Sequence, residues 1–391
     1  MEWKEVDICQ LCDSVSETYK GNASEVVLIN TSDVLDGKCL NHEYVPNKKL
    51  KGQFKKTFRK GDILYSEIRP ANKRFCFVDF EPKDYIASTK LMVLRAHEDV
   101  DPQYLYQILR SNDTLAQLQM LAESRSGTFP QITYSELSNI MVSLPSQKAQ
   151  KNIVSILSSL DRKIELNNKI NADLEEMAQA IFKNWFVDFE PFKDGKFVDS
   201  ELGMIPEGWK VISLSEIMKY NGGSQPPASE FIDTYQEGYI RFIQIRDYDN
   251  DSHITYIPIS KRNKLCDELD IMIARYGAAL GRICWGLKGA YNVALAKVTP
   301  IKSYYREYLR CYLNTSYFYQ SINNKGARCA QSGFNQSDIN SYMIAFPIDE
   351  TVVMNFNDLC SSIMDKRLSL KYENSRLSLL RDTLLPRLMS G

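Results

Sequence analysis

Apolar residues recur at alternating steps of four and three through one stretch near the middle of the chain. No proline or glycine interrupts this stretch between Pro145 and Pro191. A 4-3 alternation is the seam of a left-handed coiled coil. The pattern therefore predicts one helix of roughly 39 residues, about 60 Å long. Its seam positions are Ile153, Leu157, Leu160, Ile164, Asn167, Asn171, Leu174, Ala178, Ile181 and Trp185.

A second helical pattern lies near the C-terminus, after Pro347, and Pro386 is expected to end it. A long helix with one apolar stripe needs a partner to bury that stripe, so we expect the two helices to pair antiparallel. The alternative is two core helices of one large domain, but ordinary globular helices average only about 11 residues. The apolar residues fall every seven positions, at Phe356, Ile363, Leu370, Leu377 and Leu384, with Leu359, Leu380 and Leu388 beside them.

Asn167 and Asn171 interrupt the middle of the first seam. A polar residue at such a position can fix the register of a coiled coil at some cost in stability. The same two residues can equally mark a flat, less tightly packed patch. The sequence leaves both interpretations open.

The same succession of segments occurs twice, about two hundred residues apart. Each half has a Trp-Lys start, a strand, a tyrosine-rich helix, a polar loop and a short apolar strand that ends in proline before the long helix. Six matches in one order indicate a true repeat. The matched segments include Trp3–Lys4 and Trp209–Lys210, 60–65 and 268–273, 104–121 and 308–323, 125–131 and 331–336, 140–145 and 342–347, and 160–164 and 364–368.

The repeat predicts an α+β protein with two globular α/β domains joined by two long antiparallel helices in a coiled coil, with pseudo-twofold symmetry. Proline and glycine mark a linker between the halves. The expected parts are 1–145 (first domain), 146–187 (central helix), 188–207 (linker), 208–346 (second domain) and 347–391 (C-terminal helix).

Composition places the chain among soluble globular proteins, with 44% hydrophobic and 25% charged residues. No apolar run is long enough for a bilayer and the start lacks a signal-peptide core, so a cytoplasmic location is expected. Nine scattered cysteines fit free thiols, and the pair Cys9 and Cys12 lacks the further ligands of a zinc site. The net charge of −1 argues against indiscriminate nucleic-acid binding. A basic cluster at 48–60 suits phosphate contacts, although a solvated loop explains it equally well.

Catalytic motifs are missing from the sequence. It has no Walker A motif, and Gly277–Gly281 lacks the spacing of a dinucleotide fingerprint. Gln225-Pro226-Pro227-Ala228 lacks the amide position and the aromatic ring of the adenine-methyltransferase motif. The three histidines, His42, His97 and His253, are widely separated, and nothing in the sequence supports a nucleophile–base pair among them. These observations favour a binding protein over an enzyme.

The end of the central helix and the following linker carry a family resemblance. The segments 180–192 (AIFKNWFVDFEPF), 201–209 (ELGMIPEGW) and 384–388 (LLPRL) resemble the specificity subunits of type I restriction–modification enzymes. The resemblance covers essentially the whole chain and is most specific in the helices and the linker. It implies that each globular domain reads one half of a split, asymmetric DNA target. The helices would set the spacing, since a rod of about 60 Å exceeds one DNA turn of about 34 Å.

The resemblance also implies partners: double-stranded DNA, two modification (methyltransferase) subunits and restriction (translocase and nuclease) subunits. S-adenosylmethionine, ATP and magnesium would belong to those partners, and this chain would hold no cofactor, no metal and no catalytic residue. Exposed charges on the long helices are candidates for holding the modification subunits, although an ordinary solvated face explains them equally well. They are Glu165, Lys169, Glu175, Glu176, Lys371 and Arg376.

Candidate DNA-binding residues are those whose side chains suit phosphates or base edges. In the first domain they are Lys55, Lys56, Arg59, Arg69, Asn72, Lys73, Arg74, Arg125, Ser126, Thr128 and Gln131. In the second they are Gln244, Arg246, Arg275, Arg282, Lys325, Arg328, Gln331, Ser332 and Gln336. Arg74 and Gln244 can also pair internally.

Two other functions remain open at this stage. One is a stand-alone DNA-binding regulator or coiled-coil scaffold, which would bind tightly without partners. The other is a nuclease or methyltransferase with an unrecognised site, which would act on DNA by itself.

Overall fold

The computed structural model describes residues 3–48, 52–124, 130–251, 253–326 and 336–390. The chain divides into two compact units, the first made of residues 1–164 and 376–391 and the second of residues 165–375. The division cuts across both long helices, α4 (Gln147–Phe186) and α8 (Thr351–Ser390), which have 40 residues each. Each unit therefore holds one globular domain and a portion of each helix.

The first unit contains two four-stranded sheets. One has the antiparallel order β2-β11-β8-β9, and the other has the order β6-β3-β10-β7 with β3 and β10 parallel. A separate antiparallel pair joins β1 to β12, next to the start of α4. The strands are β1 (Lys4–Asp7), β2 (Cys12–Val15), β3 (Glu25–Ile29), β4 (Val34–Leu35), β5 (Lys38–Cys39), β6 (Val45–Pro46), β7 (Phe54–Lys56), β8 (Ile63–Ser66), β9 (Phe75–Phe77), β10 (Tyr85–Ser88), β11 (Leu91–Ala96) and β12 (Met141–Leu144). The helices are α1 (Pro102–Arg110), α2 (Asn112–Glu123) and α3 (Tyr134–Ser138).

The second unit repeats this topology. Its sheets have the orders β16-β23-β20-β21 and β18-β17-β22-β19, with β17 and β22 parallel, and β15 pairs with β24. The strands are β15 (Trp209–Ser213), β16 (Met218–Gly222), β17 (Tyr239–Ile243), β18 (Tyr256–Pro258), β19 (Leu265–Cys266), β20 (Ile271–Ala274), β21 (Ile283–Cys284), β22 (Gly289–Tyr291), β23 (Leu295–Pro300) and β24 (Met343–Pro347). The helices are α5 (Arg306–Leu313), α6 (Ser316–Gly326) and α7 (Gln336–Asn340).

Apart from the β4–β5 hairpin, which only the first domain has among the described strands, the strands of the two domains match one for one. The predicted tandem repeat and mixed α/β class are therefore confirmed. One detail of the repeat was wrong. Each tyrosine-rich segment forms two helices rather than one. Ser111 caps the start of α2, because its hydroxyl oxygen accepts a hydrogen bond from the Thr114 amide. Thr315 accepts from the Phe318 amide in the same way at the start of α6.

In unit 1, the beginning of α4 packs into the domain core. Ile153 and Leu157 of the predicted seam are buried in one cluster with Leu385 of α8 and with α1 residues such as Leu105. The two helices are thus side by side here. The Asp161 carboxylate accepts a bond from Arg381 Nη1 at 2.8 Å.

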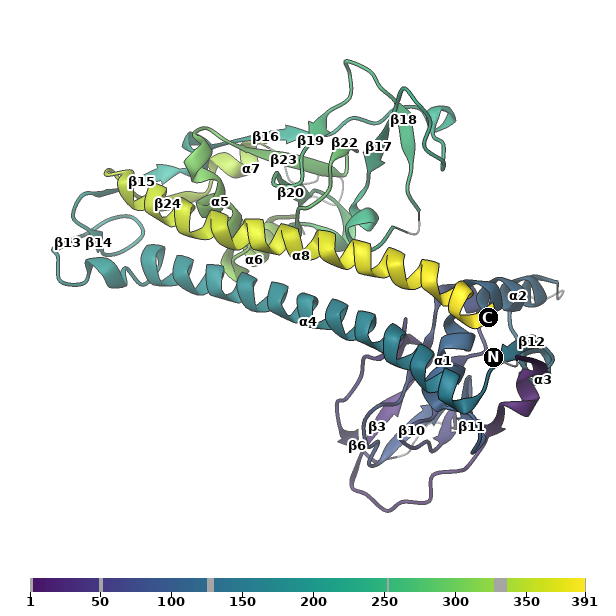
Figure 1. The fold of residues 1–391 in the computed structure, drawn as a ribbon. Helices are drawn as coiled ribbons and strands as arrows, with labels where there is room; N and C mark the ends of the chain where they lie inside the picture. Colours follow the sequence, from purple (N-terminus) through teal and green to yellow (C-terminus); the bar gives the residue numbers. More distant parts are fainter. Residues whose placement is uncertain (1–2, 49–51, 125–129, 252, 327–335, 391) are drawn as a thin grey trace. The chain divides into compact units, whose positions relative to one another are not determined.

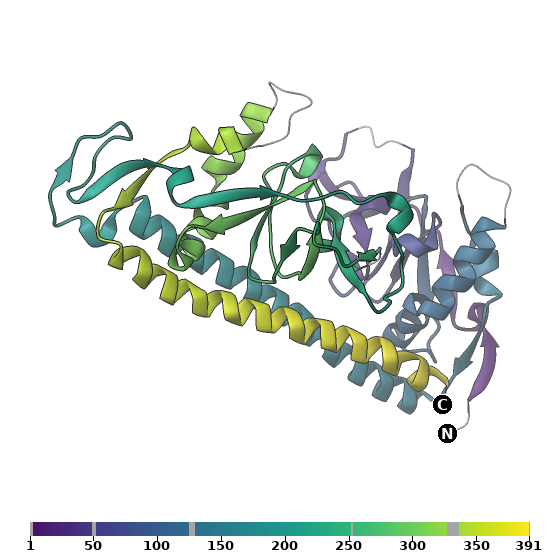
Figure 2. The same cartoon turned by 90° about the horizontal axis from the view of Figure 1, so that it is seen from above.

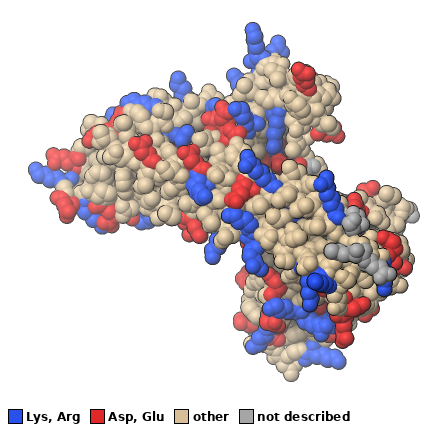
Figure 3. Space-filling view, in the orientation of Figure 1, with Lys and Arg blue, Asp and Glu red and all other residues tan. Residues whose placement is uncertain are grey.

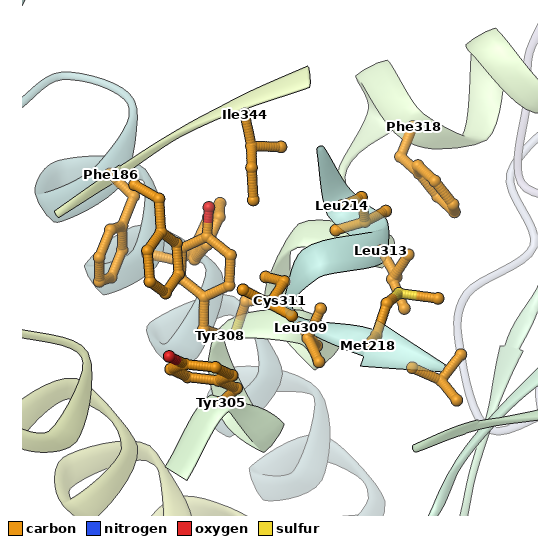
Figure 4. Packing of buried hydrophobic residues seen from close by; sticks show 14 of the residues in the cluster. Phe186, Leu214, Met218, Tyr305, Tyr308, Leu309, Cys311, Leu313, Phe318 and Ile344 are labelled. Carbon is orange, nitrogen blue, oxygen red and sulfur yellow. The ribbon is translucent and has the colours of Figure 1, made fainter. Parts of the chain in front are cut away.

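In unit 2, the end of α4 runs beside the beginning of α8, and Figures 1 and 2 show the two ribbons next to each other. Phe182 and Phe186 pack with Phe356 of α8 and with Tyr308 of α5. The rings of Phe186 and Tyr308 meet edge to face with their centres 4.8 Å apart. Figure 4 shows both side chains within the cluster. This aromatic cluster anchors the second domain to the helix pair.

All ten predicted seam residues of α4 are buried or half-buried, as the 4-3 pattern predicted. Helix α8 differs from the prediction in two respects. Leu359 and Leu380 are 46% and 47% exposed, and the positions between the heptad residues are filled instead by Cys360, Arg367 and other side chains. Pro386 does not end the helix, which continues to Ser390, because a proline near a helix end removes few internal hydrogen bonds.

The linker after α4 is not wholly irregular. It contains a short antiparallel hairpin of β13 (Phe197–Val198) and β14 (Ile205–Pro206). Phe189 and Phe192 pack edge to face on Trp209 at 5.1 and 5.2 Å. The aromatic residues of this segment therefore hold the linker against the second domain. Among the described helices, none has an apolar run long enough to cross a bilayer.

Candidate nucleic-acid interface

Five of the described candidates of the first domain lie near one end of the sheet β2-β11-β8-β9: Arg69, Asn72, Lys73, Arg74 and Gln131. Strands β2 and β8 end there, and β11 and β9 begin there. We call this end, with its loops 16–24, 67–74 and 89–90, the loop edge of the first domain. Arg69, Asn72, Lys73 and Arg74 all lie on the loop 67–74.

The loop 67–74 is tightly held. Arg69 and Lys73 have φ angles of 46° and 52°, the left-handed conformation that is unusual for residues other than glycine. The Ala71 amide donates to Gln119 Oε1 of α2 at 3.0 Å. Strained backbone of this kind is often found at binding sites, where the surrounding structure keeps it in place. The loop therefore presents Arg69, Asn72 and Lys73 as exposed side chains on a fixed backbone.

Gln131 meets this loop although it is far away in sequence. It pairs with Ile68 in an antiparallel bridge, and the Arg69 amide donates to the Pro130 carbonyl at 3.0 Å. Arg74, in contrast, turns inward and donates from Nη1 to the carbonyls of Ser32 and Val34. Arg74 thus ties the loop 67–74 to the segment around Ser32 and Val34.

The three candidates of the basic cluster, Lys55, Lys56 and Arg59, lie in different surroundings. Lys55 is exposed, whereas Lys56 Nζ donates to the carbonyls of Thr89 and Leu91 at 3.2 and 2.8 Å. Burial lowers the pKa of Lys56. Arg59 is exposed, but it precedes β8 and so lies at the opposite end of that strand from the loop edge.

The second domain has the equivalent loop edge, formed by loops 223–230, 275–282 and 292–294 at one end of the sheet β16-β23-β20-β21. Arg275 lies there with its guanidinium carbon 5.8 Å from the ring centre of Tyr220 and 5.1 Å from that of Tyr276. Gln336 joins them, since its Oε1 accepts from the Tyr220 amide at 3.2 Å. The structure thus brings together two predicted residues, Arg275 and Gln336, around Tyr220.

The remaining candidates of this domain whose side chains are described are Gln244, Arg246 and Arg282. Gln244 caps the short turn after β17, and the neighbouring Ile243 carbonyl accepts from the Asn292 amide. Arg246 is exposed on that turn. Arg282 is occupied internally, since its Nη2 donates to Asp249 Oδ1 at 2.7 Å.

Six candidates, Arg125, Ser126, Thr128, Arg328, Gln331 and Ser332, lie outside the described residues. Lys325 belongs to the last turn of α6, but its side chain also lies outside the description. For all of the candidates, DNA binding stays a prediction.

Tyr220 and Tyr276 were missed by the sequence reasoning, which searched for fork-shaped polar side chains. Burial raises the pKa of Tyr220, and Tyr276 is 41% exposed. The signal that was available is the Arg275–Tyr276 pair directly after an apolar strand. Arginine beside an exposed aromatic residue is a common arrangement at nucleic-acid surfaces.

Only some of the charged residues of the long helices that were predicted to hold the modification subunits are exposed to solvent. Glu165, Lys169, Glu176 and Arg376 are exposed. Glu175 and Lys371 are not, contrary to expectation. Glu175 forms an ion pair with Arg367 and accepts from Asn314 Nδ2. Lys371 lies 5.5 Å from the ring centre of Trp285.

No other chemistry stands out in the described part of the chain. It contains no cluster of three or more histidine, cysteine or acidic residues suited to a metal ion, and its cysteines are free thiols. Figure 3 shows lysine and arginine interspersed with acidic side chains on the face in view, in keeping with the net charge of −1.

Comparison with known proteins identifies the family. The model of the type I restriction modification DNA specificity domain matches residues 2–176 and 206–368, one match for each repeat. The chain is 32% identical to the type I restriction enzyme HindI specificity subunit of Haemophilus influenzae, with 100% of this chain and 99% of that protein covered. The chain therefore belongs to the family of type I restriction–modification specificity subunits, as its sequence motifs indicated.

Two further comparisons agree. The type I restriction enzyme MjaIX specificity subunit of Methanocaldococcus jannaschii is 26% identical, over 90% of this chain and 84% of that protein. The crystal structure of the type I restriction–modification S subunit from M. genitalium has a similar fold, with a TM-score of 0.57 at 16% identity, over 100% of this chain and 97% of that chain.

Proposed function

We propose that this protein is the sequence-specific DNA-recognition subunit of a type I restriction–modification complex. Each globular domain reads one half of a split target, and the helices α4 and α8 set the distance between the halves. The observation that carries this proposal is the strand-by-strand repeat of one domain, with side chains that differ at the two loop edges. Arg69, Asn72 and Lys73 present one chemistry, whereas Arg275, Tyr276 and Gln336 present another.

A target read by unlike domains is asymmetric. Identical subunits related by twofold symmetry read palindromes, because each half-site meets the same side chains. Here the two copies of the domain lie in one chain and have diverged. We therefore expect two half-sites of different sequence, separated by base pairs that no side chain contacts.

The long helices are also proposed to hold the modification subunits. Exposed charged residues on α4, such as Glu165 and Lys169, alternate with exposed apolar residues, among them Leu166 and Met177, which are 51% and 52% exposed. On α8, Leu379 is 70% exposed. Apolar side chains surrounded by charges are typical of protein–protein interfaces.

Partners supply the chemistry in this proposal. Two modification subunits would methylate adenine with S-adenosylmethionine after flipping the base, and restriction subunits would use ATP and magnesium to cleave unmodified DNA. This chain would contribute recognition and no catalytic residue. It would act in the cytoplasm, where the host DNA lies.

Domain exchange tests the proposal. The protein is co-expressed with its modification subunits, and methylated adenines are mapped across the host genome. Replacing one globular domain with that of a relative should change one half of the motif and leave the other half and the gap unchanged. A motif that changes in both halves, or in neither, would contradict the division of labour.

Assays with the purified chain test the alternative of a stand-alone regulator or scaffold. In that case the purified chain should bind one sequence tightly without partners, and adding the modification subunits should produce no methylation. Methylation by the purified chain with S-adenosylmethionine alone would instead identify an enzyme.

A further inference from the structure

The loop that follows β16, residues 223–230, belongs to the second domain's loop edge but contains none of the DNA-binding candidates predicted from the sequence. We propose that Gln225 on this loop reads an adenine of the second half-site, and that Tyr276 packs on a thymine methyl group beside it. This inference rests on the proposed function. It adds two specificity-determining residues and assigns a base to each.

The backbone of this loop is fixed by close contacts. A Cβ atom on Gly223 would lie 2.0 Å from the Asn292 carbonyl oxygen, so only glycine fits here. The Gly223 amide donates to the Leu295 carbonyl at 3.1 Å, and the Ser224 amide donates to the Tyr291 carbonyl at 3.2 Å. Pro226 and Pro227 restrict the chain immediately afterwards. Gln225 therefore projects from a rigid loop.

Rigid placement matters for reading a base. A side chain on an ordered backbone loses less conformational entropy on binding, so more of its hydrogen-bond energy appears as discrimination. Gln225 is exposed, and the described contact of its amide is a long one of 3.4 Å to the Pro226 carbonyl. A glutamine amide matches the N6 and N7 edge of adenine in the major groove.

Arg275 connects this loop to Tyr276. A Cβ atom on Gly222, the last residue of β16, would lie 3.0 Å from Arg275 Nη1, so the Arg275 side chain lies close to the start of the loop 223–230. Arg275 also donates from Nη1 to the Val293 carbonyl at 3.2 Å, and its guanidinium lies against the Tyr276 ring. Arg275 thus holds Tyr276 in position, and the exposed part of the ring offers an apolar surface to a thymine methyl group.

Base analogues test each contact separately. The complex with modification subunits is titrated with duplexes that carry the mapped target and one substitution at a time. Replacing the adenine with 7-deazaadenine removes N7, and replacing the thymine with uracil removes the methyl group. For the wild-type complex, we expect at least one 7-deazaadenine position in the second half-site to weaken binding. We expect at least one uracil position there to weaken it about three- to fourfold, the value of one buried methyl group.

In the variants of Gln225 and Tyr276, the base analogues should no longer weaken binding. In Gln225→Ala, discrimination at one adenine should fall about five- to a hundredfold, and 7-deazaadenine at that position should no longer matter. In Tyr276→Ala, the uracil penalty should disappear. In Gly223→Ala, the loop must shift, so the loss seen in Gln225→Ala should recur although Gln225 is present.

Matched controls are available in the same domain. Gln236 and Tyr235 are exposed and precede β17, whose opposite end adjoins the loop edge. Gln236→Ala and Tyr235→Ala should leave every preference unchanged. Melting curves of all variants should match the wild type, except for a modest decrease in Gly223→Ala.

The inference and the proposed function fail in different ways. If the wild-type complex shows no sequence preference, the proposed function is wrong. If the wild type reads a split target but Gln225→Ala and Tyr276→Ala keep every analogue penalty, the assignment of these two residues is overturned and the proposed function stands.

Discussion

The side-chain amide of Asn167 on α4 donates to the side-chain oxygen of Asn374 on α8 at 2.9 Å. The same Asn167 nitrogen lies 2.9 Å from Glu373 Oε2, and Asn374 in turn donates to Asn168 at 2.8 Å. Asn167 is fully buried. These bonds join specific positions of the two helices, so they favour the first interpretation of the seam asparagines, in which a polar residue fixes the register.

Replacing Asn167 tests this role. Asn167→Ala removes the buried amide that donates to Glu373 and Asn374, which should lower the free energy of unfolding by about 1–3 kcal/mol. Denaturant melts monitored by circular dichroism measure the change. Asn184 is exposed on the same helix, and Asn184→Ala should alter the stability by less than about 0.5 kcal/mol. Equal effects of the two substitutions would contradict a special role for Asn167.

The sequence predicted the long helices well because their burial is periodic. Every apolar member of the α4 series lies on the seam, and no tertiary information was needed to find it. The seam of α8 was harder to predict, since Arg367, Asn374 and Arg381 occupy three positions spaced by seven. A search for apolar residues passes over these and selects the exposed Leu359 and Leu380 instead.

The candidate site was only partly predictable, because residue type does not reveal direction. Arg69 and Arg74 lie five positions apart on one loop, yet Arg69 is exposed and Arg74 donates to carbonyls beneath the loop. Likewise, the sequence cannot show that Gln131 meets Ile68, since that contact depends on the fold. Tertiary hydrogen bonds decide which basic side chains remain available to a ligand.

Neighbouring lysines make this point testable. Lys55 is exposed, and Lys55→Ala should weaken DNA binding by the complex at all sequences. The slope of log K against log salt should fall by about 0.9, the value for one lost phosphate contact. Fluorescence anisotropy at several salt concentrations measures both quantities. If this slope is unchanged in Lys55→Ala, Lys55 makes no phosphate contact.

Lys56 should behave differently. Its ammonium group bonds to the carbonyls of Thr89 and Leu91, so Lys56→Ala leaves two partly buried acceptors without their donor. We expect a loss of about 1–2 kcal/mol in stability. Lys55→Ala serves as the control in the same melts and should change the stability by less than about 0.5 kcal/mol. If only Lys55→Ala lowered the stability, Lys55 and not Lys56 would be the lysine that stabilises the fold.

A surface cluster at the start of α8 predicts a pH effect. Bonds from Lys302 and Tyr304 lower the pKa of Glu350 from 4.5 to about 2. Because the pKa is lower in the folded state than in the unfolded state, this contribution to stability is present above about pH 4.5 and is lost as the pH falls toward 2. Wild type should therefore melt at a higher temperature than Glu350→Gln at pH 7, and the difference should narrow below pH 4.5.

Thermal melts from pH 7 to pH 3 compare the two proteins. Glu201 is exposed, and Glu201→Gln provides a carboxylate control that should melt like the wild type across this range. A constant difference between wild type and Glu350→Gln at every pH would show that the cluster stabilises the protein without ionisation of Glu350.

Asp161 and Asp365 occupy matching positions in the two repeats, yet their surroundings differ. Asp161 accepts from Arg110 of α1 and from Arg381 of α8, both at 2.8 Å, whereas Asp365 is exposed. Asp161→Asn removes the charge that balances two largely buried arginines. We expect it to lower the stability by about 2–3 kcal/mol, less than for a fully buried pair because Asp161 is 30% exposed.

Asp365→Asn is the matched control, since it makes the same chemical change at the equivalent position of the other repeat. It should shift the stability by less than about 0.5 kcal/mol. Denaturant melts give the comparison, and hydrogen exchange of α1 amides locates the loss near Arg110. If both variants lower the free energy of unfolding by the same amount, the bonds of Asp161 to Arg110 and Arg381 add no stability beyond that of the exposed Asp365.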